Sequence, residues 1–143
     1  MRLADVGDAG AWPDAPDAVV ALHACGPAAD LVLDAAARSG ARRLFLAPCC
    51  YGASVPFQAT AARATRAMSF VADDVLRRRI TAALVDQERA LRLEVAGFET
   101  VIEEFVAPTV TPHNLLFVAT RTDDASRVAR ARARLDELRA MGG

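Results

Sequence analysis

Two short apolar segments of this chain each run directly into a turn that carries cysteine. Residues 18–23 lead to Cys25, and residues 44–47 lead through Pro48 to the pair Cys49-Cys50. Both segments have the length and composition of buried strands. Since the carboxyl ends of neighbouring parallel strands line the ligand crevice of an α/β sheet, we predict that the two cysteine turns converge at one site.

The stretch between the two segments has the pattern of a helix. Gly26-Pro27 places proline in a first turn, and Ser39-Gly40 supplies a stop. A helix over residues 26–38 followed by a strand over residues 42–47 completes a β-α-β unit, which requires parallel strands.

The middle of the chain is expected to be mostly helical. Residues 52–70 are rich in Ala and Thr and are predicted to be irregular or weakly helical. Residues 73–96 are predicted to form a long helix that ends at Gly97. Its expected apolar stripe has a period near 3.6 and consists of Leu76, Ile80, Ala83, Leu84, Leu91 and Val95.

The last third of the chain predicts two strands and a helix. Residues 98–106 and 114–121 have strand character, and the turn over residues 108–113 suits an antiparallel pair. Asp123 is a candidate cap for a final helix. The narrow apolar stripe of that helix comprises Val128, Ala131, Leu135 and Leu138.

Composition limits the class of protein. A chain of 143 residues that is 53% hydrophobic suits one domain, residues 1–143, and excludes disorder. It has no apolar run long enough to span a bilayer and no signal-peptide pattern, so no membrane partner is expected. Three cysteines without C-x-x-C spacing indicate reduced thiols and a cytoplasmic location. A net charge of −1 gives no general attraction to nucleic acid.

Four motifs resemble one family. The segment His23-Ala-Cys25-Gly26-Pro-Ala-Ala-Asp30, then Pro48-Cys49-Cys50-Tyr51, Glu104-Phe-Val and Thr111-Pro-His-Asn-Leu-Leu are similar to a bacterial family of class I S-adenosylmethionine (SAM) methyltransferases. Its eukaryotic relatives include tRNA ribose 2′-O-methyltransferases. The resemblance runs to about residue 121 and implies methyl transfer to an acceptor, with RNA and tRNA as candidates. Relatives with assigned RNA substrates often have His after the double cysteine, where this chain has Tyr51.

The resemblance also implies a fold. We expect a partial, three-layer, Rossmann-like α/β sheet that ends in an antiparallel strand pair. Residues 18–23 and 43–48 should be parallel neighbours. Residues 98–106 and 114–121 should pair antiparallel, with 114–121 beside 43–48.

Site roles follow from the same resemblance. An acidic residue at the end of the family's third strand contacts the adenine amine, and the next residue packs on the ring. The expected cofactor-binding residues are therefore Asp5, Val6 and His23. The expected catalytic residues are His23, Cys25, Asp30 and Cys49, and the expected substrate-binding residues are Gly26, Pro48, Cys50, Tyr51 and Asn114.

Several of these residues also have a structural interpretation. Asp5 could be one of several solvated aspartates near a frayed terminus. Cys25 and His23 could be buried at a strand end, and Asp30 could be a first-turn carboxylate that the helix dipole favours. Because side chains alternate along a strand, only one of Cys49 and Cys50 is expected to point into the crevice. Asn114 could bond backbone in a turn.

Three mechanisms remain open for such a site. In the first, the site positions and desolvates an acceptor in line with the SAM methyl group, with His23 or Asp30 orienting a proton. In the second, a cysteine thiolate, Cys25 or Cys49, adds to a pyrimidine ring before methylation. In the third, His23 and the three cysteines form a closed Zn²⁺ site. Adjacent cysteines rarely both reach one tetrahedral centre, so no metal site is expected.

The start of the chain departs from the resemblance. No glycine-rich cofactor loop precedes Ala18, so we expect the C-terminal two-thirds of a methyltransferase domain, with weak SAM binding. The apolar edge over residues 18–23 would then be uncovered and would favour self-association. The alternative to an enzyme is a catalytically inactive, methyltransferase-like fragment that acts as an oligomerisation or interaction module.

Overall fold

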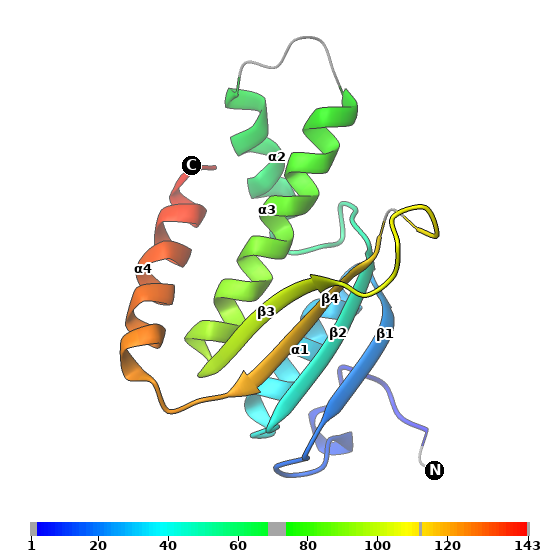
Figure 1. Ribbon diagram of the computed structural model, residues 1–143, viewed down its shortest axis with the longest axis vertical. Coiled ribbons are helices and arrows are strands. Elements are labelled where there is room, and N and C mark those ends of the chain that lie inside the picture. Colours follow the sequence, from blue (N-terminus) through cyan, green and yellow to red (C-terminus); the bar gives the residue numbers. More distant parts are fainter. Residues whose placement is uncertain (1–2, 69–73, 112, 143) are drawn as a thin grey trace.

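The computed structural model describes residues 3–68, 74–111 and 113–142. Helices and strands alternate at first, and the chain ends with two adjacent strands and a helix (Figure 1). In chain order the elements are η1 Ala9–Ala11, β1 Val19–Cys25, α1 Ala28–Arg38, β2 Arg43–Cys50, α2 Gln58–Ala67, α3 Asp74–Val95, β3 Phe98–Glu104, β4 Leu115–Arg121 and α4 Ala125–Ala140.

In the described part of the chain, the strands form one mixed sheet in the order β1-β2-β4-β3. β1 and β2 are parallel, with Val19 opposite Leu44. β4 runs antiparallel to β2 on one side and to β3 on the other. These pairings confirm the predicted parallel neighbours, the antiparallel pair and the position of β4 beside β2.

One face of the sheet is buried against α1. Ala29, Leu33 and Ala36 recur at helical spacing and are at most 1% exposed. They share one buried cluster with Leu44 of β2 and Phe117 of β4. This cluster fixes the β1-α1-β2 unit and therefore the relative position of the two cysteine turns.

A second apolar cluster lies among α2, α3 and α4, beside the sheet (Figure 1). Three residues of the stripe predicted for the last helix, Ala131, Leu135 and Leu138, are buried in it. Val128, the fourth, is half-buried. None of the helices in the described residues has the length and apolar character needed to cross a membrane.

The other face of the sheet is not covered by a helix, so the predicted three-layer arrangement is wrong for the described residues. Within the described residues, no helix lies in front of the sheet in Figure 1. The register aligns Val20, Phe45, Val118 and Val101 across the strands on this open face. Val20 is 64% exposed and Val101 is 54% exposed. The described chain is therefore a two-layer structure, because its helices gather on one face and at one side of the sheet.

The long helix was placed correctly, and its predicted apolar stripe is confirmed in part. Leu91 is buried, and Leu84 and Val95 pack against the second apolar cluster. α3 starts at Asp74, while the predicted first residue, Asp73, lies outside the described residues. Leu76 is 47% exposed and Ala83 is exposed. The buried positions of α3 include Asp86 and Arg89. A search for apolar periodicity misses this face because charged residues occupy it as ion pairs.

Two local predictions also need correction. The segment predicted to be irregular or weakly helical contains a regular helix, α2, which buries Ala61, Ala64 and Thr65. Residues 69 and 70 of that segment lie outside the described residues. The cap of α4 is Asp124 instead of Asp123, because Asp124 Oδ1 accepts hydrogen bonds from the backbone N–H groups of Ser126 and Arg127.

Candidate functional site

Two β-bulges shape the carboxyl ends of β1 and β2. The register passes from Leu22 opposite Ala47 to Ala24 opposite Pro48, which leaves His23 without a partner position on β2. It then passes to Cys25 opposite Cys50, which leaves Cys49 as an extra residue on β2. Bulges break the strict alternation of side chains along a strand.

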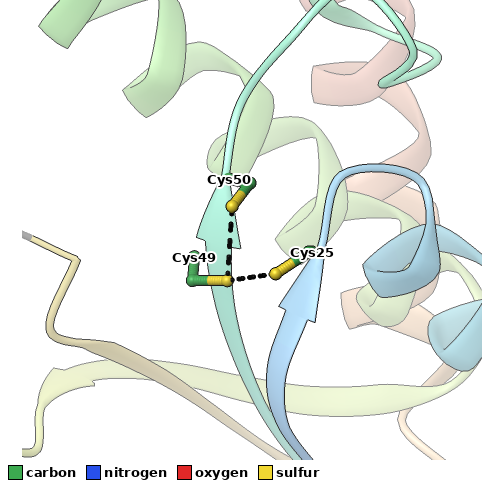
Figure 2. Close-up of side chains that lie close together, drawn as sticks. All are labelled: Cys25, Cys49 and Cys50. Atoms are coloured by element: carbon green, nitrogen blue, oxygen red, sulfur yellow. Dashed lines mark hydrogen bonds between the residues drawn. The ribbon is translucent and has the colours of Figure 1, made fainter.

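The bulges bring three sulfur atoms together. Cys25 Sγ lies 2.8 Å from Cys49 Sγ, and Cys49 Sγ lies 3.5 Å from Cys50 Sγ (Figure 2). All three sulfurs lie within 4.8 Å of one another. The predicted convergence of the two cysteine turns is confirmed. The expectation that only one cysteine of the adjacent pair points to the site is wrong, because the bulge at Cys49 removes the alternation on which it depended.

The three thiols are accessible but not equivalent. Cys25 and Cys50 are exposed, and Cys49 is intermediate. Hydrogen bonds from Cys49 and Cys50 lower the pKa of the Cys25 thiol. The hydrogen bond to Cys25, with burial as the second cause, raises the pKa of Cys49 to about 12. Cys25 therefore ionises before Cys49, and the Cys49 thiol can donate its hydrogen to the Cys25 thiolate.

His23 is not the core histidine that its apolar surroundings suggest. It is exposed, and its backbone has a φ of 55° at the bulge. Histidine is one of the few non-glycine side chains found in this left-handed region. Gly26 also has a positive φ, of 54°, in the turn that leads into α1. The imidazole is consequently available at the end of β1, beside the cysteine turn.

A buried group of charges lies behind the two cysteine turns. Arg89 of α3 is completely buried, and its Nη2 donates to Asp30 Oδ2 at 2.8 Å and to the Gly26 carbonyl oxygen at 3.3 Å. Tyr51 donates its hydroxyl hydrogen to Asp86 Oδ2 at 2.7 Å. The Arg89 guanidinium also lies 5.7 Å from the centroid of the Tyr51 ring. One arginine thus connects the turn after Cys25 with the turn after Cys50.

Burial controls the ionisation of this group. It raises the pKa of Asp86 to about 6, although Tyr51 and Arg89 oppose the shift. Arg89 opposes the shift through its charge, since its Nη1 lies 3.5 Å from Asp86 Oδ1. Burial, followed by the Asp86 charge, raises the pKa of Tyr51, so the phenol remains a donor.

Asp30 belongs to this buried group. Its Oδ1 accepts a hydrogen bond from Arg92 Nη1 at 2.7 Å, in addition to the Arg89 contact at Oδ2. Its side chain is 6% exposed. The structure therefore places Asp30 beneath the cysteine turns, with both carboxylate oxygens engaged. Asp30 fits the predicted first-turn position in α1, and the arginine partners were not predicted.

Asp5 and Val6 lie apart from the cysteines, in an N-terminal segment without a strand in its described part. Asp5 is exposed, and its Oδ1 accepts a hydrogen bond from the backbone N–H of Gly7 at 2.7 Å. The Val6 carbonyl oxygen accepts a hydrogen bond from Trp12 Nε1 at 3.0 Å. Val6 and Trp12 line a cavity of about 380 Å³ along β1, with Val19, Val20, Ala21 and Val32 among its other lining residues.

The connection between β3 and β4 reaches the same edge of the sheet. Asn114 Nδ2 donates to the Val106 carbonyl oxygen at 2.9 Å, as its interpretation as a turn residue predicts. The His113 ring lies 5.7 Å from the Tyr51 ring, centroid to centroid. Pro112, part of the predicted turn, lies outside the described residues. His113 was not among the predicted site residues, since its proximity to Tyr51 depends on the strand order.

The residues that sequence reasoning missed are Asp86, Arg89, Arg92 and His113. A usable signal for the first three is their spacing, since they recur every third residue and share a helix face. The direction of that face cannot be read from spacing alone.

Residues 3–54 match the family described as a methyltransferase domain. We found no match among curated proteins or solved structures. The matched segment contains β1, α1 and β2, with all three cysteines, and ends before α2. The comparison thus supports a methyltransferase domain on the part of the chain that carries the three cysteines.

Proposed function

We propose that this chain carries the acceptor side of a SAM-dependent methyltransferase site. The acceptor is not identified by the site, and RNA is the class to test first because of the resemblance to tRNA methyltransferases. The observation that carries the proposal is the overlap of two independent findings. The segment matched to a methyltransferase domain is residues 3–54, and the convergent turns with Cys25 and Cys49 lie within it. This edge of a parallel strand pair is where α/β folds bind ligands.

In this proposal SAM supplies an electrophilic methyl group when bound. The chain's own residues align the acceptor and exclude water. Pro48, Cys50, Tyr51 and Gly26 shape the acceptor platform, and Asn114 holds the β3–β4 connection beside it. His23, which is exposed at the end of β1, takes or orients the acceptor's proton.

Asp30 acts in this proposal as a positioning residue. Its two carboxylate oxygens hold Arg89 and Arg92, and Arg89 in turn holds the Gly26 carbonyl oxygen. Loss of Asp30 would therefore move the turn that carries Cys25. Cys25 and Cys49 contact the acceptor and limit where it can sit.

The cofactor site is only partly supplied by the described residues. An adenine ring needs an apolar wall, and Val6 and Trp12 offer one in the cavity beside β1. The Asp5 carboxylate is engaged with the backbone of Gly7 and is not among the cavity's lining residues. We therefore expect weak SAM binding by the chain alone and derive no step through the cofactor.

A label-transfer assay tests the proposal. The chain is incubated with methyl-labelled SAM at millimolar concentration, with total RNA or with RNA-free protein extract as the acceptor pool. Label should enter RNA and fall at least tenfold in Cys49→Ala. Arg38→Ala, at an exposed position of α1, is the matched control and should transfer label normally. The absence of transfer to both pools would exclude methyl transfer by this chain, and transfer to protein alone would exclude the RNA acceptor.

A second candidate function is an inactive module that associates with itself. It is favoured by the position of β1 at the sheet edge and by Val20 and Leu22, which are 64% and 63% exposed. Light scattering should then give a mass above 15.2 kDa, the mass of one chain. Leu22→Lys should return the monomer, whereas Leu31→Lys, on an exposed position of α1, should not. A monomeric wild-type chain would exclude this function.

A further inference from the structure

We propose that Cys25, Cys49 and Cys50 form a binding site for a thiophilic divalent cation of the Zn²⁺ class, with three thiolate ligands and an open fourth position. The three sulfurs lie within 4.8 Å of one another, with Sγ–Sγ distances of 2.8 Å and 3.5 Å for the two hydrogen-bonded pairs. A tetrahedral centre with Zn–S bonds of about 2.3 Å places its sulfurs roughly 3.8 Å apart. Small side-chain rotations would therefore bring the three sulfurs to metal-binding distances.

The backbone prepares this arrangement before any ion arrives. Cys25 comes from β1, whereas Cys49 and Cys50 come from β2, and the strands are joined in register by hydrogen bonds. The bulge at Cys49 lets two consecutive side chains approach the same point (Figure 2). The usual objection to adjacent cysteines as ligands of one metal, their opposite directions along a strand, therefore does not apply here.

The donor set selects the type of ion. Among the described residues, the group contains three sulfurs and no carboxylate or imidazole. Thiolates favour Zn²⁺ and similar soft or borderline ions, whereas Mg²⁺ and Ca²⁺ require oxygen ligands. The cluster therefore fits a zinc-class ion by its chemistry as well as by its spacing.

The fourth position is open to solvent. Cys25 and Cys50 are exposed, and His23 is not part of the group. This differs from the closed site of His23 and three cysteines considered from the sequence. Three protein ligands and an open position are typical of zinc sites that bind water or a substrate atom. An acceptor atom at this edge of the sheet could occupy that position.

The amino end of a helix follows the first of the three cysteines. α1 begins at Ala28, three residues after Cys25, and the amino end of a helix stabilises a nearby thiolate. Metal binding would displace the shared protons and release them to solvent.

Metal titration of the reduced protein tests the proposal. Metal-free chain is kept in a non-thiol reductant, and three free thiols are verified by mass spectrometry. Zn²⁺ should bind at one ion per chain in competition with a chromophoric chelator. Co²⁺, used as a spectroscopic probe, should give a thiolate charge-transfer band and the visible spectrum of a four-coordinate ion.

The variants assign the ligands. Cys25→Ser, Cys49→Ser and Cys50→Ser should each weaken Zn²⁺ binding at least tenfold and reduce the charge-transfer band. His23→Ala is the matched control and should bind Zn²⁺ like the wild type. Circular dichroism of each metal-free variant verifies that it is folded.

Three results would overturn the proposal. These are no stoichiometric Zn²⁺ binding by the reduced chain, unchanged binding in all three serine variants, or a loss in His23→Ala as large as in the serine variants. The measurement uses neither SAM nor a methyl acceptor. Failure of the metal site and failure of methyl transfer are therefore distinguished.

Discussion

The cysteine cluster and the charges behind it are adjacent in the fold but opposite in character. Cys25 and Cys50 are exposed, whereas Arg89 is completely buried. The two groups are joined through Gly26 and Tyr51, which directly follow Cys25 and Cys50 in the sequence. The comparison indicates a division of tasks, in which buried charges fix the turns and exposed thiols remain free to react or bind. It also predicts that substitutions in the two groups affect stability very differently.

The largest expected effect is at Arg89. Arg89→Met takes a buried cation away from Asp86, which keeps the Tyr51 hydroxyl, and from Asp30, which keeps Arg92. Breaking a buried ion pair in this way typically costs about 3–5 kcal/mol. Urea denaturation should show a loss of this size in the free energy of unfolding.

Arg78→Met, on an exposed position of the same helix, is the matched control for Arg89→Met. It should change the free energy of unfolding by less than about 0.5 kcal/mol. Equal stabilities of the two variants would mean that the buried charges do not hold the turns in place.

The next effect is the pH dependence that Asp86 imposes. Its pKa is about 6 in the folded chain, against about 3.9 in an unfolded one. Between these values the folded state binds more protons than the unfolded state, so its stability should fall as pH rises from about 4 to about 6. Over this range the titration of Asp86 should lower the free energy of unfolding by roughly 2–3 kcal/mol.

Asp86→Asn keeps an acceptor for the Tyr51 hydroxyl and removes the titration. Urea denaturation at several pH values should show that the free energy of unfolding of Asp86→Asn changes less than that of the wild type between roughly pH 4 and pH 6, the range set by the two pKa values. Asp136→Asn, on an exposed position of α4, serves as the control and should retain the wild-type profile. A wild-type profile in Asp86→Asn would contradict the raised pKa.

The sequence predicted the cysteine cluster better than the charges. Two apolar strands separated by one helix are enough to place Cys25 beside Cys49, because right-handed β-α-β units leave little freedom. Bulges depend on the pairing of both strands, so the second sulfur of the Cys49-Cys50 pair could not be placed. Asp86 and Arg89 were missed for another reason. Sequence periodicity assigns charged residues to solvent, and their burial depends on partners on α1 and on the turn after β2.

A third prediction concerns the difference in reactivity within the cluster. At pH 8 Cys25 should react with iodoacetamide at least tenfold faster than Cys49, as an order-of-magnitude expectation. The reason is that hydrogen bonds from Cys49 and Cys50 lower the pKa of Cys25, while those contacts and burial raise the pKa of Cys49 to about 12. Peptide mass spectrometry after timed alkylation measures both rates. Faster labelling of Cys49 would reverse the assignment of the shared proton.

The smallest expected effect is at Cys50, and it tests whether the exposed thiols contribute to stability. Cys50 is an exposed residue at the end of β2, so Cys50→Ser should change the free energy of unfolding of the metal-free chain by less than about 0.5 kcal/mol. Leu46→Ala, at a completely buried position of the same strand, is the control and should cost about 2–5 kcal/mol. Urea denaturation in chelator and reductant measures both variants. A large loss in Cys50→Ser would show that the thiols stabilise the strand ends themselves, because a serine hydroxyl of similar size would then fail to replace a contact that folding requires. A small loss, together with weakened Zn²⁺ binding, would show that Cys50 contributes to metal binding and not to the stability of the fold.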